Sequence, residues 1–299
     1  MLVDPKWLES RLDDPGVAVV DMRWRGDGSG RALLQEGHVQ GATPLDWSED
    51  IVDPDAEYAF MLAPPERFAE AMERAGIGDG DTVVAYADDG GSGPFRLWWA
   101  FRVHGHHDEV CILDGGWERW VAEGRPVSAE PPPERPRAVW TPRPSTVRPA
   151  TAGEVVDAAA RPDVVVLDAR PSRQYAGLAV WFETGPVPAD DDGIAHTPRG
   201  DLRAGHVPGA VSVPSARLYR DDGTMKSPDE LRDLFGRCGA RLGEPGTTAV
   251  AYCGVGISAS ALLYALHRAG VDAKLYDASW EEWGRRPDLP VERVVSPPR

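Results

Sequence analysis

One cysteine, Cys253, stands in a loop of small residues between an apolar run, TTAVAY, and a helical stretch. Gly254 and Gly256 permit backbone conformations that other residues resist. Successive N–H groups of the loop can therefore curl around the sulfur, backed by the positive end of the following helix. Such surroundings stabilise a thiolate, and they would stabilise an anionic persulfide on the same sulfur. The pattern predicts a nucleophilic cysteine. Its loop comprises Gly254, Val255, Gly256, Ile257 and Ser258.

The other two cysteines have plainer surroundings. Cys111 lies inside the apolar run VCILD, and Cys238 follows a helical stretch, so we interpret the first as a small core residue and the second as a bystander. The chain has no CxxC pair, so the spacing indicates neither a zinc site nor a dithiol redox site. Few cysteines and no visible export signal favour a reducing, cytoplasmic setting.

Charge and hydropathy narrow the class of partner. The 299 residues carry a formal net charge of −16, whereas nucleic-acid binding depends on clustered Lys and Arg. No stretch approaches the length of roughly 18 apolar residues that a membrane span requires. We therefore expect small-molecule partners, and neither nucleic acid nor membrane.

The chain contains the same pattern twice. AVVDMRW matches VVVLDAR, GHVQGA matches GHVPGA, DTVVAYADDGG matches TTAVAYCGVG, and LDGGWERW matches YDASWEEW, in the same order. Four ordered matches predict two homologous domains. Their bounds are residues 1–125 and 151–299, joined by a proline-rich linker, 126–150, whose Trp140 should hold it against the surface.

Each copy alternates strand-length apolar runs with helical patterns. In the first, VVAYA and VCILD flank the helical run PFRLWWAFRVHGH, and another helix follows Pro64; in the second, a helix begins at Ser227. This alternation predicts an α/β domain with a mainly parallel sheet and helices on both faces. Chemistry in such sheets collects at the carboxyl ends of the strands, where Cys253 stands. We expect Ser258 or Ser260 to cap the helix after the cysteine and Gly270 to end it.

These features together resemble the tandem rhodanese sulfurtransferases over nearly the whole chain. The resemblance rests on GHVQGA and GHVPGA, on DGGWERW and DASWEEWG, and on the single cysteine in a strand-to-helix loop of the second half. It implies two rhodanese-type domains, the first inactive because Ala87 occupies the cysteine's place. It also implies thiosulfate or 3-mercaptopyruvate as donor, a persulfide on Cys253, and cyanide or a thiol, including a protein thiol, as acceptor. It implies no cofactor and no metal.

The donor stays open between these two anions. Thiosulfate-using members of the family carry positive residues after the cysteine, whereas CGVGIS resembles the neutral loop of mercaptopyruvate sulfurtransferases. Those enzymes carry an Arg where this chain has Gln174, and a second Arg where it has a longer acidic insertion, residues 178–204. Candidates for binding the donor's negative charge are Arg173, Arg199 and Arg203, since a guanidinium suits carboxylate or sulfonate oxygens. Arg170, Arg96, His38 and His206 are interpreted as structural.

Two other readings compete. The resemblance extends to CX5R phosphatases, which share the fold, but their phosphate-binding Arg position is Ala259 here. A binding, sulfur-sensing or carrier module with a catalytically weak cysteine is the stronger alternative. Gln174 and Phe60 support it, because they stand where the mercaptopyruvate enzymes carry an Arg and a His. Donor-dependent sulfur loading on Cys253 would discriminate between an enzyme and such a module.

Overall fold

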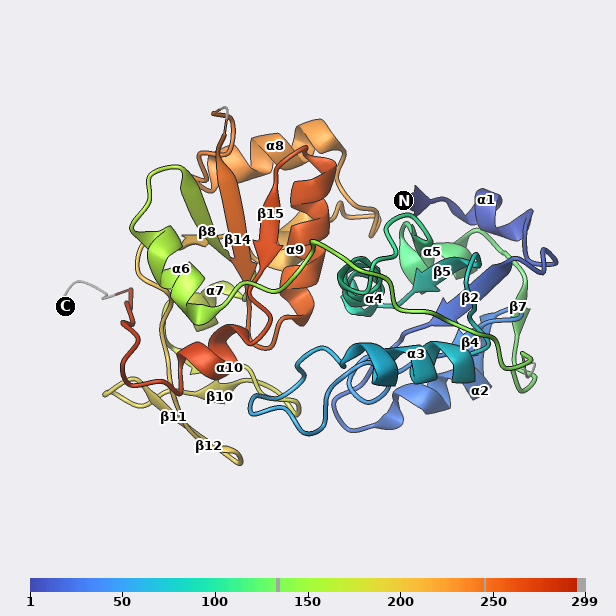
Figure 1. Ribbon diagram of the computed structural model, residues 1–299, viewed down its shortest axis with the longest axis horizontal. Helices are drawn as coiled ribbons and strands as arrows, with labels where there is room; N and C mark the ends of the chain where they lie inside the picture. The colour runs from blue at the N-terminus through green and yellow to red at the C-terminus, as the bar shows by residue number, and fades with distance from the viewer. Residues whose placement is uncertain (133–134, 245, 295–299) are drawn as a thin grey trace. The chain divides into compact units, whose positions relative to one another are not determined.

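The computed structural model describes residues 1–132, 135–244 and 246–294, and its contacts divide the chain into two compact units (Figure 1). The first contains Met1–Asp55, Leu62–Val147 and Tyr219–Met225; the second contains Ala56–Met61, Arg148–Leu218 and Lys226–Arg299. The units follow the two sequence copies, but each includes a short segment of the other half, which the repeats did not predict. Residues 133–134 of the predicted linker and 295–299 of the predicted second domain lie outside the described residues.

The first unit is built on a five-stranded parallel sheet with the order β1-β6-β5-β2-β4. Its apolar runs are buried along their length, as expected for a sheet covered on both faces. The strands are β1 (Leu2–Val3), β2 (Val17–Asp21), β4 (Thr43–Pro44), β5 (Thr82–Tyr86) and β6 (Val110–Leu113). The main helices are α1 (Pro5–Glu9), α3 (Pro65–Arg74), α4 (Gly93–Val103) and α5 (Gly116–Ala122).

The second unit repeats this plan around a parallel sheet of order β13-β8-β14-β15. Helix α6 packs against β8, and α9 packs against β14 and β15. The strands are β8 (Val164–Asp168), β13 (Val211–Ser212), β14 (Thr248–Tyr252) and β15 (Ala273–Leu275). The helices are α6 (Ala152–Ala159), α8 (Pro228–Arg237), α9 (Ile257–Arg268) and α10 (Ser279–Trp283). The predicted α/β fold with mainly parallel sheets is confirmed.

Short elements complete the two units. The acidic insertion contains four small strands, in which β9 pairs with β10 and β11 with β12, both antiparallel. These elements are η1 (Ser29–Ala32), α2 (Leu33–Glu36), β3 (His38–Val39), β7 (Val127–Ser128), α7 (Ser172–Tyr175), β9 (Ala179–Val180), β10 (Val187–Pro188), β11 (Ile194–Thr197), β12 (Gly200–Arg203) and η2 (Ser215–Leu218). No helix in the described ranges is long and apolar enough to cross a membrane.

A buried ion pair recurs at the same place in both sheets. Arg170 donates to both carboxylate oxygens of Asp168 and to the Gly205 carbonyl, and its guanidinium lies over the Trp280 ring. In the first copy, Arg23 makes the equivalent bonds to Asp21 and Gly37 and lies over Trp117. Buried carboxylates and guanidinium groups need such partners. The structural interpretation of Arg170 therefore agrees with its contacts.

The helix ends follow the sequence in part. Ser227 caps α8 in a capping box with Glu230, and Gly270 follows the last turn of α9 with a φ of 81°. The expected serine cap of α9 is wrong, because Gly256, with a φ of 79°, is the N-cap. Ser260 lies one turn inside the helix, where its hydroxyl donates to the Gly256 carbonyl at 2.8 Å. Because Gly256 adopts the left-handed conformation at the N-cap, α9 begins at Ile257, and both Ser258 and Ser260 lie inside the helix.

The linker packs against the first unit, as its tryptophan predicts. Trp140 is 2% exposed. Its indole stacks on His106 with ring centroids 4.3 Å apart and meets Phe68 and Phe101 edge-on. The described part of the linker is therefore a fixed part of the fold up to residue 147.

A buried cysteine loop as candidate active site

Cys253 follows the last residue of β14, at the carboxyl edge of the second sheet. Strand β14 lies between β8 and β15, and its last residue, Tyr252, pairs with Asp168 of β8. The cysteine is 2% exposed, and α9 begins four residues further on. The strand therefore delivers the thiol to the edge at which parallel sheets carry their sites.

The first turn of α10 binds the beginning of the cysteine loop at three points. The Cys253 N–H donates to the Ser279 hydroxyl at 3.0 Å. The Trp280 N–H donates to the Cys253 carbonyl at 3.0 Å, and the Glu281 N–H donates to the Gly254 carbonyl at 2.9 Å. Both carbonyl groups of the loop start are thus turned toward α10.

These contacts also fix the direction of the loop N–H groups. In a planar trans peptide the C=O and N–H groups point in opposite directions. The N–H groups of Gly254 and Val255 therefore point away from α10, and among the described residues no main-chain carbonyl accepts from them. The first N–H groups of α9 are likewise left over at its amino end. The loop offers several unused donors to an anion on the side away from α10.

An aromatic cluster lies against the loop; Trp181 and Phe182 come from the insertion and Phe60 from the segment 56–61. Trp181 lies against Gly254 so closely that a Cβ added to that glycine would be 3.2 Å from the Trp181 Cβ. The Phe60 ring meets the Trp181 ring edge-on at 5.9 Å. The Arg199 guanidinium lies over both Phe60 and Phe182, at 5.5 and 5.1 Å from the ring centroids. The second unit therefore places Arg199 on the aromatic side of the loop.

The three candidate arginines have different surroundings. Arg203 donates to four main-chain carbonyls, of Gly284, Leu289, Trp283 and Arg286, so its guanidinium is satisfied inside the protein. Arg199 pairs with Glu183 at 2.7 Å and approaches Glu281 at 3.8 Å. Arg173 is exposed on α7, beside a Gln174 whose buried Oε1 has no partner among the described residues.

The other two cysteines, Cys111 and Cys238, lie outside this loop and have different surroundings. Cys111 is buried in β6, and burial raises the pKa of its thiol. Cys238, at the end of α8, accepts a hydrogen bond from Arg217 through its sulfur at 3.3 Å. Neither follows a strand into a loop of unused N–H groups.

The first copy has one of the same main-chain hydrogen bonds, but Ala87 replaces the cysteine. The Trp117 N–H donates to the Ala87 carbonyl at 2.9 Å, just as Trp280 does to Cys253. Gly116, however, occupies the position of Ser279. Ser279 was not among the predicted site residues, although the difference between LDGGWERW and YDASWEEW at this position is the signal that marks it.

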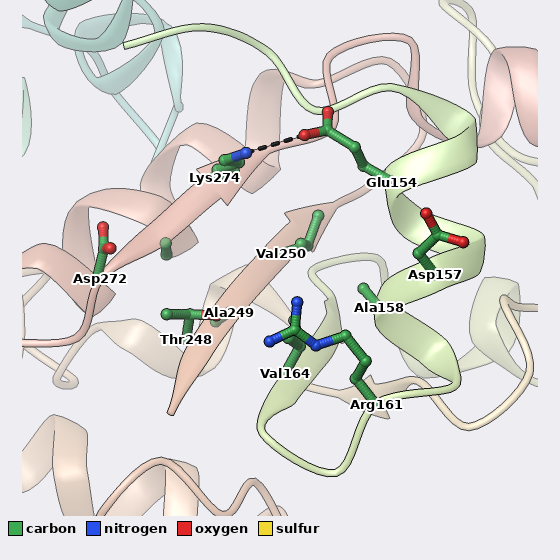
Figure 2. A pocket seen from close by; sticks show the side chains of 11 residues that line it. Glu154, Asp157, Ala158, Arg161, Val164, Thr248, Ala249, Val250, Asp272 and Lys274 are labelled. Carbon is green, nitrogen blue, oxygen red and sulfur yellow. Dashed lines mark hydrogen bonds and ion pairs between the residues drawn. The ribbon is translucent and has the colours of Figure 1, made fainter. Parts of the chain in front are cut away.

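A separate cavity lies at the opposite ends of the strands. It has a volume of about 260 Å³ and includes Val164 and Thr248, at the amino ends of β8 and β14. Figure 2 shows Lys274 on its rim, paired with Glu154 of α6 at 2.9 Å. Since Cys253 follows the other end of β14, this cavity does not belong to the cysteine loop.

Comparison with known proteins places both halves of the chain in one domain family. The sequence model of the rhodanese-like domain matches residues 4–123 and again residues 151–286. The thiosulfate sulfurtransferase of Rattus norvegicus is 34% identical over 305 residues, covering 99% of this chain and 95% of that protein. The sulfur carrier protein TtuD of Thermus thermophilus is 32% identical over 301 residues, covering 98% and 96%. The crystal structure of the 3-mercaptopyruvate sulfurtransferase SseA from Escherichia coli superimposes with a TM-score of 0.76 at 27% identity, covering 93% of this chain and 98% of that one.

Proposed function

The chain belongs to the rhodanese family of sulfurtransferases, and on that premise we propose that it moves sulfane sulfur from a small donor to a thiophilic acceptor through a persulfide on Cys253. The observation that carries this proposal is the loop geometry. The carbonyls of Cys253 and Gly254 are turned to α10, and in the part of the chain that the structure describes the N–H groups of Gly254 and Val255 have no main-chain acceptor. Preorganised donors of this kind stabilise negative charge that develops on a reacting atom.

In the loading step the Cys253 thiolate attacks the transferable sulfur of the donor, which is the thiol sulfur of 3-mercaptopyruvate or the outer sulfur of thiosulfate. With 3-mercaptopyruvate, a sulfur–sulfur bond forms as the carbon–sulfur bond breaks, and the electron pair leaves on pyruvate enolate, which takes a proton to give pyruvate. With thiosulfate the same attack releases sulfite. The loop N–H groups support the anionic sulfur, and the buried position of Cys253 limits access of water.

In the release step the acceptor attacks the outer sulfur. Cyanide then leaves as thiocyanate, or a thiolate leaves as a new persulfide, and the Cys253 thiolate is restored. The half that holds Ala87 contributes no nucleophile. The acceptor class follows from the chemistry of the persulfide, and a protein thiol is one member of it.

For the donor, we propose 3-mercaptopyruvate ahead of thiosulfate. The loop CGVGIS has no charged side chain, and the nearby Arg199 is already paired with Glu183. A dianion requires more positive charge than a carboxylate does. Glu183 offsets only part of the Arg199 charge, so Arg199 is the proposed partner of the singly charged carboxylate, and the exposed Arg173 is the second candidate. Because the chain has few cysteines, a reducing, cytoplasmic setting stays a prediction.

A carrier role is the second candidate function. It is favoured by the similarity to TtuD, which is called a sulfur carrier protein and is matched along almost its whole length. A carrier would load one sulfur on Cys253 and release it to one protein acceptor, whereas a transferase would turn over with small acceptors.

The decisive experiment compares sulfur loading in cysteine variants. We expect intact-mass analysis after incubation with 3-mercaptopyruvate to show one added sulfur in the wild type and in Cys111→Ala/Cys238→Ala. Cys253→Ala should show none and should form no thiocyanate from cyanide. Substantial turnover in Cys253→Ala would refute the assignment of the nucleophile, and stoichiometric loading without turnover would favour the carrier.

A further inference from the structure

We propose that Ser279 is a positioning residue for sulfur transfer, which holds Cys253 and the loop N–H groups in their working orientation. The inference rests on the proposed function, since it concerns the same loop. It arises from a hydroxyl that is fully buried, lies on a strained backbone, and bonds to the main chain of the nucleophile itself.

The backbone at Ser279 is one that side chains avoid. Its φ is 53°, in the left-handed region, where residues other than glycine are uncommon. The first copy has Gly116 at the same position, with a φ of 55°. Glycine adopts this conformation without a steric penalty. The copy that contains Cys253 therefore has a serine at a position where the backbone conformation favours glycine. The group that serine has and glycine lacks is the hydroxyl.

Both hydrogen-bonding roles of this hydroxyl are used. It accepts from the Cys253 N–H at 3.0 Å and donates to the Tyr276 carbonyl at 2.8 Å. Because the Ser279 side chain is 0% exposed, it is shielded from solvent. Its effect on the reaction must therefore pass through the main chain of Cys253.

The consequence is a fixed direction for the nucleophile. With its N–H held by Ser279 and its carbonyl held by the Trp280 N–H, the Cys253 residue is bound on both sides. The Cα–Cβ bond, and with it the thiol, is then set relative to the N–H groups of Gly254 and Val255. Misplacement of a reacting group by about 1 Å can cost on the order of 100-fold in rate.

A pair of substitutions separates the hydroxyl from the strain. Ser279→Ala removes the hydroxyl and keeps a side chain at positive φ, whereas Ser279→Gly removes both the hydroxyl and the strain. We expect kcat for sulfur loading to fall by about 10- to 100-fold in both variants. KM for 3-mercaptopyruvate should change little, because the hydroxyl does not reach the donor. The midpoint of thermal unfolding should be higher for Ser279→Gly than for Ser279→Ala.

Ser227→Ala is the matched control. It removes another hydroxyl that accepts a main-chain N–H, that of Glu230, at the start of α8. It should lower the unfolding midpoint and leave kcat unchanged. If activity instead follows stability, so that Ser279→Gly regains wild-type kcat, Ser279 has only a structural role and the proposal is wrong.

A second readout separates this proposal from the proposed function. The rate at which iodoacetamide alkylates Cys253, followed by peptide mass, reports the placement of the thiol whether or not the protein transfers sulfur. We expect both Ser279 variants to react several-fold more slowly than the wild type. An unchanged alkylation rate would overturn the positioning role. Failure of the wild type to load sulfur would overturn the proposed function alone.

Discussion

Side chains of one type have different roles within the insertion, and their partners decide which. Arg203 and Arg199 lie four residues apart, and the sequence offers both as anion-binding groups. The Arg203 guanidinium donates to carbonyls of the last residue of α10 and of the segment that follows it. Arg199 instead lies between two aromatic rings, partly exposed, with a planar fork that is suited to a carboxylate.

Substitution of Arg199 should therefore affect donor binding, whereas substitution of Arg203 should affect stability. Arg199→Lys should raise KM for 3-mercaptopyruvate about tenfold, the loss of roughly one charge-assisted hydrogen bond. Arg203→Lys should leave that KM unchanged and lower the free energy of unfolding by about 2 kcal/mol, since a lysine cannot satisfy the same carbonyls. Steady-state kinetics and urea titration measure both. The same kinetics with thiosulfate test the donor, and a clear thiosulfate preference in the wild type would contradict the proposed order.

Helix α4 ends beneath the linker, and the packing there sets the charge of a histidine. His104 is the C-cap of α4, and its ring lies 4.6 Å from that of Phe68 and 6.2 Å from that of Trp140, centroid to centroid. Burial among these rings lowers the pKa of His104 to about 4. The linker therefore covers a neutral imidazole, whose protonation would oppose folding.

This makes the first unit sensitive to mild acid. Between pH 6.5 and pH 4 the unfolded state binds a proton at His104 more readily than the folded state, so stability falls as the pH falls. Lowering the pH from 7.5 to 5 should cost about 2 kcal/mol through this group. Urea titrations of the wild type and of His104→Gln at both pH values should differ by this amount. An equal loss in both proteins would show that other groups cause the acid sensitivity.

The chain as a whole is divided at places that the repeats do not mark. Residues 56–61 belong to the second unit, where Tyr58 and Met61 pack against the apolar core. Residues 219–225 belong to the first unit, where the Met225 N–H donates to Asp114 at 2.8 Å. A cut between the halves removes a packed segment from each unit.

We therefore predict that the second half does not function alone. A fragment of residues 148–299 lacks Tyr58, Met61 and the Phe60 that meets Trp181, so it should expose apolar surface, lose solubility and lose most sulfur loading. Co-expression with residues 1–147 should restore part of the loading. A soluble, monomeric fragment with near full activity would show that the first half is not part of the working unit.

The sequence by itself determined the features that depend on neighbouring residues. Apolar runs and helical spacing predicted the two α/β copies, and a strand, a glycine-rich loop and a helix marked Cys253, because such patterns act over a few residues. Repetition also exposed Ala87 as the missing nucleophile.

Only the tertiary structure decided which distant groups meet. The bond from Cys253 to Ser279 spans 26 residues, and the carbonyls that bind Arg203 lie 80 to 86 residues away. The same holds for the segments that each unit takes from the other half, and for the start of α9, which a left-handed glycine sets against the serine pattern. These outcomes depend on how remote segments pack, and the local sequence pattern carries no record of that packing.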